Sequence, residues 1–300
     1  RGRTLNISTG GMLARFEDKL DSVPSEGEDV VVDLTAPGNG TEDCSAEARV
    51  VRVPSGDSPH CAFEFPRPPG FLHAPILVGK HPSMVDLKQR IVRLAEHPVN
   101  IFLHGESGTG KNVAAKALHY CSDLKDEPFI RVNCPSIPDT LFESYLFGSE
   151  KGAYTGADTA RPGLFRIANG GTILLDEISA IPSNMQAKLL RVIEEKEFLP
   201  VGAHESVKVD VRIIATSNAS MSTRVREGSF RHDLFYRIAE VTLQVPPLRE
   251  RRSDIPLLAD HFVRKYCKEY EMEYQPLDRD TLTTFKNYPW PGNVRELENT

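Results

Sequence analysis

Along residues 76–300 the apolar positions follow two periods in turn. Short apolar runs of strand length are separated by segments in which apolar residues recur every three or four positions, as on one face of a helix. The strand-like runs are "VNIFLHG", "PFIRVNC", "TILLDE" and "DVRIIATSN", and the helical segments include "SMVDLKQRIVRLAE", "NVAAKALHYCS" and "MQAKLLRVIEE". Apolar strands that alternate with helices predict an α/β fold, in which helices cover both faces of a parallel sheet.

The first helical segment shows the helical period most clearly. Ser83 and Asp86 have the spacing of a capping box, so we expect this helix to start near Ser83. Its apolar face is expected to carry Met84, Leu87, Ile91 and Leu94. After Pro247 the chain becomes helical and charged, which predicts a small helical subdomain over residues 249–300 that follows an α/β subdomain over residues 79–248.

Residues 1–66 show the alternating and β-branched runs that are typical of a small antiparallel β domain. These runs are Val30–Leu34, Ala46–Val53 and His60–Phe65, and the turn-rich stretches "PGNG" and "PSGDSP" separate them. The Pro-rich stretch that follows lacks any periodicity, and we interpret residues 67–78 as a linker.

Composition narrows the class of protein. The chain of 300 residues has a net charge of −6 and a pI of about 5.9, which argues against general binding of nucleic acid by these residues. No apolar run has the length of a membrane span. The five scattered cysteines contain no CxxC pair and no HExxH pattern occurs, so we expect reduced thiols in the cytoplasm rather than disulfides or zinc.

A glycine-rich loop follows the first strand-like run. "GESGTGK" lies between "NIFLH" and "NVAAKAL", which is the context of a phosphate-binding loop. The N–H groups of such a loop converge on a polyanion, and its lysine reaches the outer phosphates. We therefore expect a nucleotide, ATP, to be bound by Gly105, Glu106, Ser107, Gly108, Thr109, Gly110, Lys111 and Asn112. Asn112 stands where the motif has a Ser or Thr that binds Mg²⁺, and its amide oxygen is a weaker substitute.

Two carboxylates end the strand-like run "TILLDE". Asp176 and Glu177 are expected at the carboxyl edge of the sheet, where α/β proteins bind their ligands. Asp176 would hold Mg²⁺ directly or through water, and Glu177 would orient and deprotonate the attacking water. Asn218 and Asn133 end two other runs. Asn218 would contact the γ-phosphate or the water, although a lone Asn is also typical of the turn that ends a strand.

Three arginines are candidates for contact with the nucleotide. A cation must neutralise the charge that develops on the γ-phosphoryl group, and a neighbouring subunit can supply it. Arg231 and Arg237 in "FRHDLFYRI" suit this role, and ordinary surface salt bridges are the alternative for both. Arg295 in "WPGNVRELEN" either reaches the nucleotide from the helical subdomain or only caps and pairs locally.

These motifs resemble those of a known family. Gly105–Lys111, "LFGSEKGAYTGA", "GGTILLDEI", "MQAKLLRVIEE", "FRHDLFYRI", "PPLRERRSDIP" and "WPGNVRELEN" occur in the same order as in the AAA+ domain of the sigma-54-dependent transcriptional activators, the bacterial enhancer-binding proteins. The resemblance covers about residues 76–300 and is specific, because the loop motif is peculiar to that family. It implies a ring, commonly a hexamer, that hydrolyses ATP with Mg²⁺ at its subunit interfaces.

The resemblance also implies roles for single residues. ATP turnover would move a loop that contacts sigma-54 in the RNA polymerase closed complex, formed by Gly152, Ala153, Tyr154, Thr155, Gly156 and Ala157. Asn218 resembles sensor I, and Arg295 resembles sensor II. Arg231 and Arg237 resemble the arginines that act in a neighbouring subunit's site. Asn133 resembles the switch residue that holds the catalytic glutamate until the loop engages sigma-54.

Several positions depart from the family pattern. Tyr154 stands where the family usually has Phe, Tyr145 replaces a Glu, Ser149 replaces a His and Ser217 replaces a Thr. Asn112 stands where the family often has Glu, so the missing hydroxyl is compatible with ATPase activity.

A short motif near the amino end resembles a second family. "RTLNISTGGML" contains Asn6, Ser8 and Gly11 in the (D/N)xSxxG spacing of PilZ domains, which are small β-barrels that bind cyclic di-GMP. Asn6 and Ser8 offer side-chain hydrogen bonds, and glycine allows a close backbone approach to a phosphate or base. The resemblance implies a PilZ-like regulatory domain over residues 1–66, which acts by binding cyclic di-GMP or through contacts alone.

Two other functions fit parts of the sequence. In one, the front domain senses cyclic di-GMP while the AAA+ part mainly transmits the signal or oligomerises. A P-loop kinase fits less well, since no acceptor-binding pattern is visible and Glu177 suits the activation of water. The chain stops at "RELENT" inside a helical pattern, and we expect DNA to be bound only through a helix-turn-helix domain beyond it.

Overall fold

The structure is a computed structural model of the whole chain. It describes residues 77–153 and 160–300 in full, and within the first 76 residues it describes the backbone of five strands. The chain divides into two compact units, Arg1–His73 and Ala74–Thr300. The division between them lies inside the stretch that the sequence predicts to be a linker.

The first unit contains one five-stranded sheet. Neighbouring strands are all antiparallel, and their order is β1-β2-β5-β4-β3. The strands are β1 (Gly2–Ser8), β2 (Gly11–Phe16), β3 (Asp29–Thr35), β4 (Asp43–Arg52) and β5 (His60–Glu64). Closure of this sheet into a barrel, and its likeness to a PilZ domain, stay predictions.

The second unit is built on a parallel sheet of five strands, with the order β14-β6-β13-β10-β7. Its strands are β6 (Ile101–His104), β7 (Phe129–Asn133), β10 (Thr172–Asp176), β13 (Arg212–Ser217) and β14 (Val241–Gln244). Four of these are the predicted apolar runs, so the structure confirms the predicted α/β fold. Two short antiparallel pairs lie outside the sheet: β8 (Gly148–Ser149) with β9 (Arg161–Pro162), and β11 (Glu197–Phe198) with β12 (Val207–Lys208).

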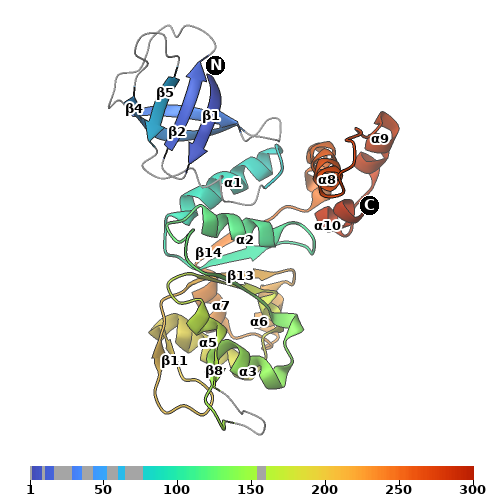
Figure 1. Ribbon diagram of the computed structural model, residues 1–300. Coiled ribbons are helices and arrows are strands. Elements are labelled where there is room, and N and C mark those ends of the chain that lie inside the picture. The colour runs from blue at the N-terminus through green and yellow to red at the C-terminus, as the bar shows by residue number, and fades with distance from the viewer. Residues whose placement is uncertain are drawn as a thin grey trace. The chain divides into compact units, whose positions relative to one another are not determined.

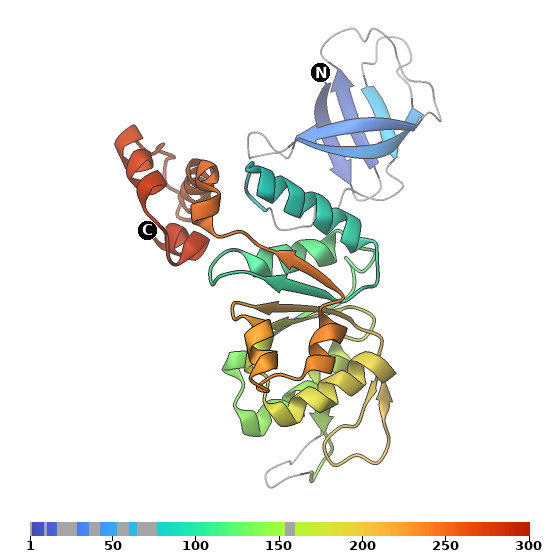
Figure 2. The same ribbon diagram turned by 180° about the vertical axis from the view of Figure 1, so that it is seen from behind.

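Helices cover both faces of this sheet, as Figures 1 and 2 show. One face carries α1 (Pro82–Ala95) and α2 (Lys111–Tyr120). The other carries α3 (Asp139–Phe147), α4 (Leu164–Ile167), α5 (Ser183–Glu195) and α7 (His232–Ile238), and α6 (Met221–Arg226) follows β13. The helical subdomain that follows consists of α8 (Ile255–Glu269), α9 (Arg279–Asn287) and α10 (Asn293–Asn299). Short 3₁₀ turns occur at Cys134–Ser136, Ile178–Ala180, Leu248–Glu250 and Arg252–Asp254.

The pleat of β10 divides the core between the two faces. Ile173 and Leu175 belong to the cluster that contains Phe142 of α3, whereas Leu174 belongs to the cluster that contains Leu118 of α2. All five of these side chains are fully buried. Burial on both faces explains why the strand is a continuous apolar run with no alternation. β10 is an interior strand of the sheet, between β13 and β7.

The start of α1 differs from the prediction. The helix begins at Pro82, and the ring nitrogen Nδ1 of His81 accepts a hydrogen bond from the Ser83 N–H at 3.3 Å. The capping box of Ser83 and Asp86 is therefore wrong, because proline is favoured at the first helical position and His81 already caps the turn. The predicted apolar face is confirmed, with Met84, Leu87 and Ile91 buried and Leu94 half-buried.

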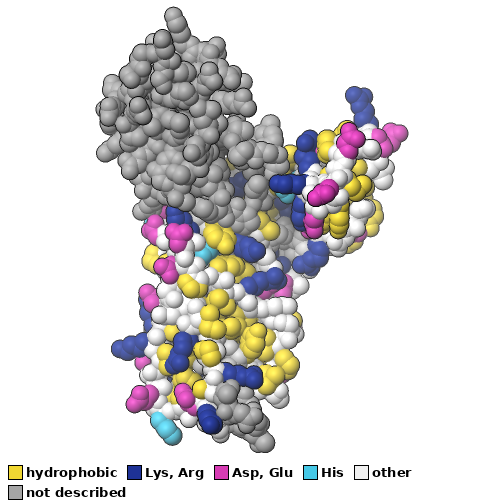
Figure 3. All heavy atoms as spheres, viewed as in Figure 1, with side chains coloured by type: hydrophobic (Ala, Val, Ile, Leu, Met, Phe, Trp, Pro, Cys, Tyr) yellow, Lys and Arg dark blue, Asp and Glu magenta, His cyan; other side chains and the backbone are white. Residues whose placement is uncertain are grey.

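The helical subdomain has a core of its own. Leu248, Ile255, Leu258 and Leu297 are buried around Trp290, whose indole N–H donates to the carbonyl of Phe285 at 2.7 Å. Lys and Arg side chains are interspersed with Asp and Glu over the face of the unit seen in Figure 3. Spanning a bilayer would require a longer and more apolar helix than any in the described part of the chain.

A buried histidine connects α2 to the sheet. His119 is 1% exposed, and its Nδ1 lies 2.9 Å from the hydroxyl of Thr172, the first residue of β10. Arg212 at the start of β13 donates to the carbonyls of Leu94 and Leu118, at the ends of α1 and α2. Burial, together with the nearby positive charge of Arg212, lowers the pKa of His119 to about 4.

We expect this histidine to make the unit less stable as the pH falls from about 6.5 to about 4. His119 stays neutral in the folded state over this range, whereas the unfolded chain takes up a proton at the ordinary pKa, so the free energy of unfolding drops by about 3 kcal/mol. Urea unfolding at a series of pH values measures the effect. His119→Gln should lose this part of the pH dependence, the exposed-site control His97→Gln should keep it, and equal slopes for all three proteins would contradict the assignment.

Candidate active site

The carboxyl ends of β6, β10 and β13 open onto a cavity of about 660 Å³. The cavity brings together many residues that the sequence singled out, namely Ser107–Asn112, Asn133, Asp176, Glu177, Asn218 and Arg295. Side chains of the helical subdomain, Leu258 and Phe262 among them, complete its wall. The site therefore lies between the sheet edge and the helical subdomain.

The phosphate loop is held closed by its own lysine. Lys111 is 6% exposed, and its Nζ donates to the carbonyls of Gly105 at 2.8 Å and Glu106 at 3.1 Å. The same Nζ lies 3.4 Å from Oε1 of Glu177. Gly108 and Gly110 have φ angles of 77° and 106°, a region that side chains disfavour, which explains the glycines at these positions.

Asp176 is the most densely bonded carboxylate of the site. Its Oδ1 accepts the Thr216 hydroxyl at 2.7 Å, and its Oδ2 accepts Nδ2 of Asn112 at 3.0 Å and Nη2 of Arg131 at 2.6 Å. Burial by itself raises the pKa of Asp176, but the hydrogen bonds from Thr216, Arg131 and Asn112 outweigh it and lower the pKa. The carboxylate is therefore ionised at neutral pH although its side chain is only 9% exposed.

Glu177 is oriented by its backbone and by two neighbours. Its φ of 55° lies in the left-handed region, which is strained for a residue with a side chain. Its N–H donates to the hydroxyl of Thr216 at 3.0 Å, and its Oε2 accepts the backbone N–H of Asn218 at 2.9 Å. Thr216 thus positions both carboxylates, a role that the sequence alone did not assign.

The residues present fit a magnesium ion that is completed by phosphates and water. Oδ1 of Asn112 is buried and accepts no hydrogen bond from the residues that the structure describes. Together with the carboxylates of Asp176 and Glu177 it supplies the oxygen donors that Mg²⁺ prefers. Within the described ranges no three Asp, Glu, His or Cys side chains gather into a metal site.

Asn293 joins the helical subdomain to the phosphate loop. It is fully buried, and its Nδ2 donates to Oε2 of Glu106 at 3.2 Å and to the carbonyl of Ser107 at 3.0 Å. Its Oδ1 accepts the N–H of Leu248 at 2.8 Å. One side chain therefore satisfies backbone groups on both sides of the junction.

The first turn of α10 lies directly on the phosphate loop. The N–H groups of Val294 and Arg295 donate to the carbonyl of Gly108 at 3.0 and 3.2 Å. A Cβ atom at Gly108 would stand 2.2 Å from the carbonyl oxygen of Gly292. The guanidinium of Arg295 donates to the Ser107 hydroxyl at 3.1 Å, so the predicted sensor arginine does reach the loop.

Two further arginines of the site were missed by the sequence reasoning. Arg249 donates to both carboxylate oxygens of Glu106, at 2.7 and 2.6 Å, and this pair lowers the pKa of Glu106. Arg251 is 2% exposed and donates to the carbonyl of Thr109 at 2.8 Å. The motif "PPLRERRSDIP" contains both, but several charges in a row gave no sign of which ones face the loop.

The predicted interface arginines lie outside the cavity. Arg231 pairs with Asp233 at 2.7 Å and Arg237 with Glu194 at 2.8 Å, and the side chains are 48% and 58% exposed. Asn133 ends β7 opposite Asp176 in the strand register. Among the residues that the structure describes, no hydrogen bond joins the side chain of Asn133 to Glu177.

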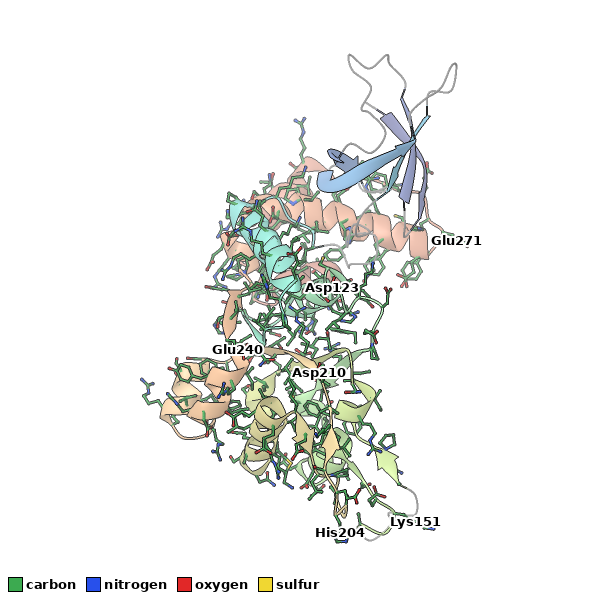
Figure 4. All side chains as sticks on the ribbon, turned by 90° about the vertical axis from the view of Figure 1, so that its left-hand side faces the viewer. Asp123, Lys151, His204, Asp210, Glu240 and Glu271 are labelled. Atoms are coloured by element: carbon green, nitrogen blue, oxygen red, sulfur yellow. The ribbon has the colours of Figure 1, made fainter. Side chains whose placement is uncertain are left out.

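Of the predicted sigma-54 loop, only Gly152 and Ala153 are described, and Tyr154, Thr155, Gly156 and Ala157 lie outside the described residues. The stem of the loop pairs with the segment between β11 and β12. The N–H of Glu150 donates to the carbonyl of Val201 at 2.9 Å, and the N–H of Val201 donates to the carbonyl of Gly148 at 3.0 Å. Figure 4 shows Lys151 and His204 at this end of the unit.

The predicted cyclic di-GMP residues lie in the first unit. Asn6 and Ser8 belong to β1, Gly11 begins β2, and Ser8 stands opposite Gly11 in the register. The side chains of Asn6 and Ser8 lie outside the part of the chain that the structure describes.

Comparison with known proteins decides the family. Residues 77–244, more than half of the chain, match the family described as the Sigma-54 interaction domain. The chain belongs to this family. Residues 249–300 match the AAA+ ATPase lid domain, so the helical subdomain is a lid and the predicted AAA+ P-loop architecture is confirmed.

Curated relatives match about three quarters of the chain. The regulatory protein AtoC of Escherichia coli (strain K12) is 48% identical over 223 residues, which are 74% of this chain and 48% of AtoC. The DNA-binding transcriptional regulator NtrC of Salmonella typhimurium is 48% identical over 224 residues, which are 75% of this chain and 48% of NtrC. The chain spans about half the length of these relatives.

A solved structure shows the same fold with a nucleotide bound. The crystal structure of NtrX from Brucella abortus in complex with ADP has a TM-score of 0.70 and 36% sequence identity to this chain. The match covers 75% of this chain and 49% of the NtrX chain.

We expect Asn293→Ala to loosen the lid of this sigma-54 interaction domain. The change leaves the buried N–H of Leu248 and carbonyl of Ser107 without their side-chain partner. Alanine also fits poorly at the φ of 54°. The free energy of unfolding should therefore fall by about 2 to 4 kcal/mol. Urea unfolding measures the loss, and hydrogen exchange at the amides of Val294 and Arg295 should accelerate. Asn299→Ala, at an exposed position in the same helix, is the matched control with little change. Unchanged exchange in Asn293→Ala would contradict the role of Asn293.

Proposed function

We propose that this chain is the ATP-hydrolysing part of a transcriptional activator that remodels the sigma-54 RNA polymerase closed complex. The observation that carries the proposal is the meeting of Lys111, Asp176 and Glu177 in one cavity, with Nζ of Lys111 3.4 Å from Oε1 of Glu177. Membership of the sigma-54 interaction domain family supports the choice of target. The reaction is the hydrolysis of ATP to ADP and phosphate.

The polar residues that the sequence singles out in the cavity each have a place in the proposed reaction. The N–H groups of the phosphate loop and Nζ of Lys111 bind the phosphates. Glu177 accepts the proton of the attacking water, since its carboxylate is held beside Asn218 at the carboxyl edge of the sheet. Asp176 and Asn112 would hold Mg²⁺, which neutralises charge on the phosphate oxygens. Arg295, which lies on the loop, contacts the phosphates from the lid.

Arg231 and Arg237 complete the site of a neighbouring copy in a ring, which we propose to be hexameric. Both guanidinium groups are about half exposed and pair with surface carboxylates of their own chain. Exposed pairs of this kind contribute little stability and exchange partners readily. A developing phosphoryl charge in a neighbour's site can therefore replace Asp233 and Glu194 as their partner.

The "GAYTGA" loop, Gly152–Ala157, delivers the result of hydrolysis to sigma-54. Its stem is anchored on the segment around Val201, so a shift of that end of the unit moves the loop. In the proposal, Asn133 releases Glu177 once the loop is engaged. We also propose that a separate domain of the whole protein binds DNA. The protein acts in the cytoplasm in this proposal.

The front unit regulates this activity in our proposal. The placement of Ser8 opposite Gly11 in the register of β1 and β2 supports a PilZ-like site, in which we propose that Asn6, Ser8 and Gly11 bind cyclic di-GMP. The alternative is that cyclic di-GMP sensing is the main function and that the AAA+ part transmits the signal or oligomerises.

The ATPase rate per protomer should rise with protein concentration, because each site needs a neighbouring subunit.

Lys111→Ala should abolish ATP turnover, and Arg231→Ala and Arg237→Ala should each lower it at least a hundredfold, since a trans-acting arginine contributes about 10³ or more. Arg226→Ala, at another exposed position, is the matched control that keeps the rate. The same series with and without cyclic di-GMP tests the front unit. A rate that stays constant on dilution to single protomers, or normal turnover by Lys111→Ala, would overturn the proposal.

Replacing Thr155 should separate the two halves of the function. Thr155→Ala should keep the wild-type ATPase rate, because none of the described residues Gly148–Ala153 that lead into the loop lines the cavity, but it should lose binding to sigma-54 in a pull-down. His204→Ala, beside the loop stem, is the control that keeps both. Equal loss of hydrolysis and binding in Thr155→Ala would mean that the loop is structural.

A further inference from the structure

The oxygen Oδ2 of Asp176 accepts three hydrogen bonds, which leaves it no free lone pair to bind a metal ion. Nε and Nη2 of Arg131 donate to it at 3.2 and 2.6 Å, and Nδ2 of Asn112 donates at 3.0 Å. The other oxygen of the carboxylate accepts the Thr216 hydroxyl. A carboxylate oxygen offers about two lone pairs, so a cation can bind Oδ2 only if one of these donors leaves.

Of these donors, Arg131 is the one that can most easily move away from Asp176. Asn112 and Thr216 are neutral and lie within the phosphate loop's helix and the sheet, whereas Arg131 is positively charged and repels a second cation. Its side chain is 48% exposed, against 9% for Asp176. Arg131 belongs to β7, the edge strand of the sheet, and lines the same cavity as Lys111 and Glu177. A guanidinium in this position can swing into solvent at little cost.

A buried carboxylate needs a counter-charge in every state of the protein. Lys111 does not supply it for Asp176, because Nζ of Lys111 donates to the loop carbonyls and lies beside Glu177. The ion pair with Arg131, at 2.6 Å, supplies it directly. Loss of Arg131 without a replacement leaves a buried negative charge held by neutral donors only.

We propose that Arg131 is a positioning residue that occupies the cation position of Asp176 in the metal-free protein and gives way to a divalent cation when the nucleotide arrives. Arg131 thereby fixes the Asp176 carboxylate before binding and sets how tightly the cation is held. The inference rests on the proposed function in one respect, which is the assignment of the nucleotide's cation to Asp176.

The first test uses the metal-free full chain. Arg131→Met should lower the melting temperature by about 2 to 4 °C, because Asp176 loses its counter-charge. In an Asp176→Asn background the same change should have a clearly smaller effect, since no charge is left to balance. Arg93→Met removes the same charge from an exposed site in the last turn of α1 and should shift neither background. Equal shifts by Arg131→Met in both backgrounds would overturn the proposal.

The second test measures the binding of Mn²⁺ in the presence of ADP, by the loss of the free Mn²⁺ signal in electron paramagnetic resonance. Arg131→Met should bind Mn²⁺ about three- to tenfold more tightly than the wild type, because the competing cation is gone. Arg131→Lys keeps the charge but not the two-nitrogen contact, and its affinity should lie between the two. Arg93→Met should match the wild type.

A second measurement separates this role from direct binding of the nucleotide. ADP binding without metal should be unchanged in Arg131→Met, and the gain should appear only when Mn²⁺ is present. Weaker ADP binding both with and without Mn²⁺ would make Arg131 a phosphate ligand and overturn the proposal. Unchanged Mn²⁺ affinity would also overturn it, as would a wild type that binds no Mn²⁺ with ADP.

These outcomes are independent of the proposed activity. A wild type that hydrolyses no ATP, yet binds Mn²⁺ more tightly after Arg131→Met, refutes the proposed function and leaves the role of Arg131 supported. If the wild type hydrolyses ATP but Arg131→Met leaves the Mn²⁺ affinity unchanged, only the inference about Arg131 is refuted.

Discussion

The buried charge of Asp176 is the constraint on which the site depends. A carboxylate that is 9% exposed is stable only with donors on both oxygens, and here they come from three separate elements. Thr216 stands on β13, Arg131 on β7 and Asn112 in the first turn of α2. The carboxylate of Asp176 therefore holds the central strand, the edge strand and the start of α2 in fixed positions relative to one another. The hydroxyl of Thr216 also accepts the N–H of Glu177 and so positions that residue.

The lid is attached by a different kind of contact. Its junction with the phosphate loop combines side-chain pairs, such as Arg249 with Glu106, with bonds to backbone groups. The carbonyl of Gly108 accepts two N–H groups of α10, and the Asn293 side chain bonds to the N–H of Leu248 and the carbonyl of Ser107. Backbone partners keep their hydrogen-bonding capacity whatever the side chains are. A glycine at position 108 is required for a second reason, since any Cβ would collide with Gly292. The loop is thus shaped to fit both a phosphate and the lid.

The sequence predicted those parts of the site that local pattern controls. Asp176 and Glu177 follow an apolar run, and Lys111 follows a glycine-rich turn, so their edge of the sheet could be inferred. Contacts between distant segments could not, because Arg249 and Glu106 are separated by 143 positions and several arginines near 249 look alike in the sequence.

The order of the strands and some boundaries of the elements also could not be predicted from the local pattern of the sequence. Strand β14 has a four-residue run in which only Leu243 is buried, so its apolar signal is weak. The start of α1 was misplaced because Pro82 and the His81 ring determine it rather than Ser83. Hydrogen bonds across the sheet fix the order of the strands, and those bonds leave no trace in the pattern of a single strand.

The topology gives a physical reason for relating the cavity to the proposed sigma-54 loop. Arg131 and Asn133 are two positions apart on β7, so their side chains emerge on the same face of the sheet, at the strand that flanks Asp176. From Asn133 the chain passes through the turn Cys134–Ser136 and α3 directly into β8, the stem of the loop. Phe142, Leu146 and Phe147 of α3 are fully buried in the main core, which makes this connection rigid. A change of partner at Asp176 therefore acts on a strand whose continuation carries the loop, and a packed helix transmits a shift better than a flexible segment could.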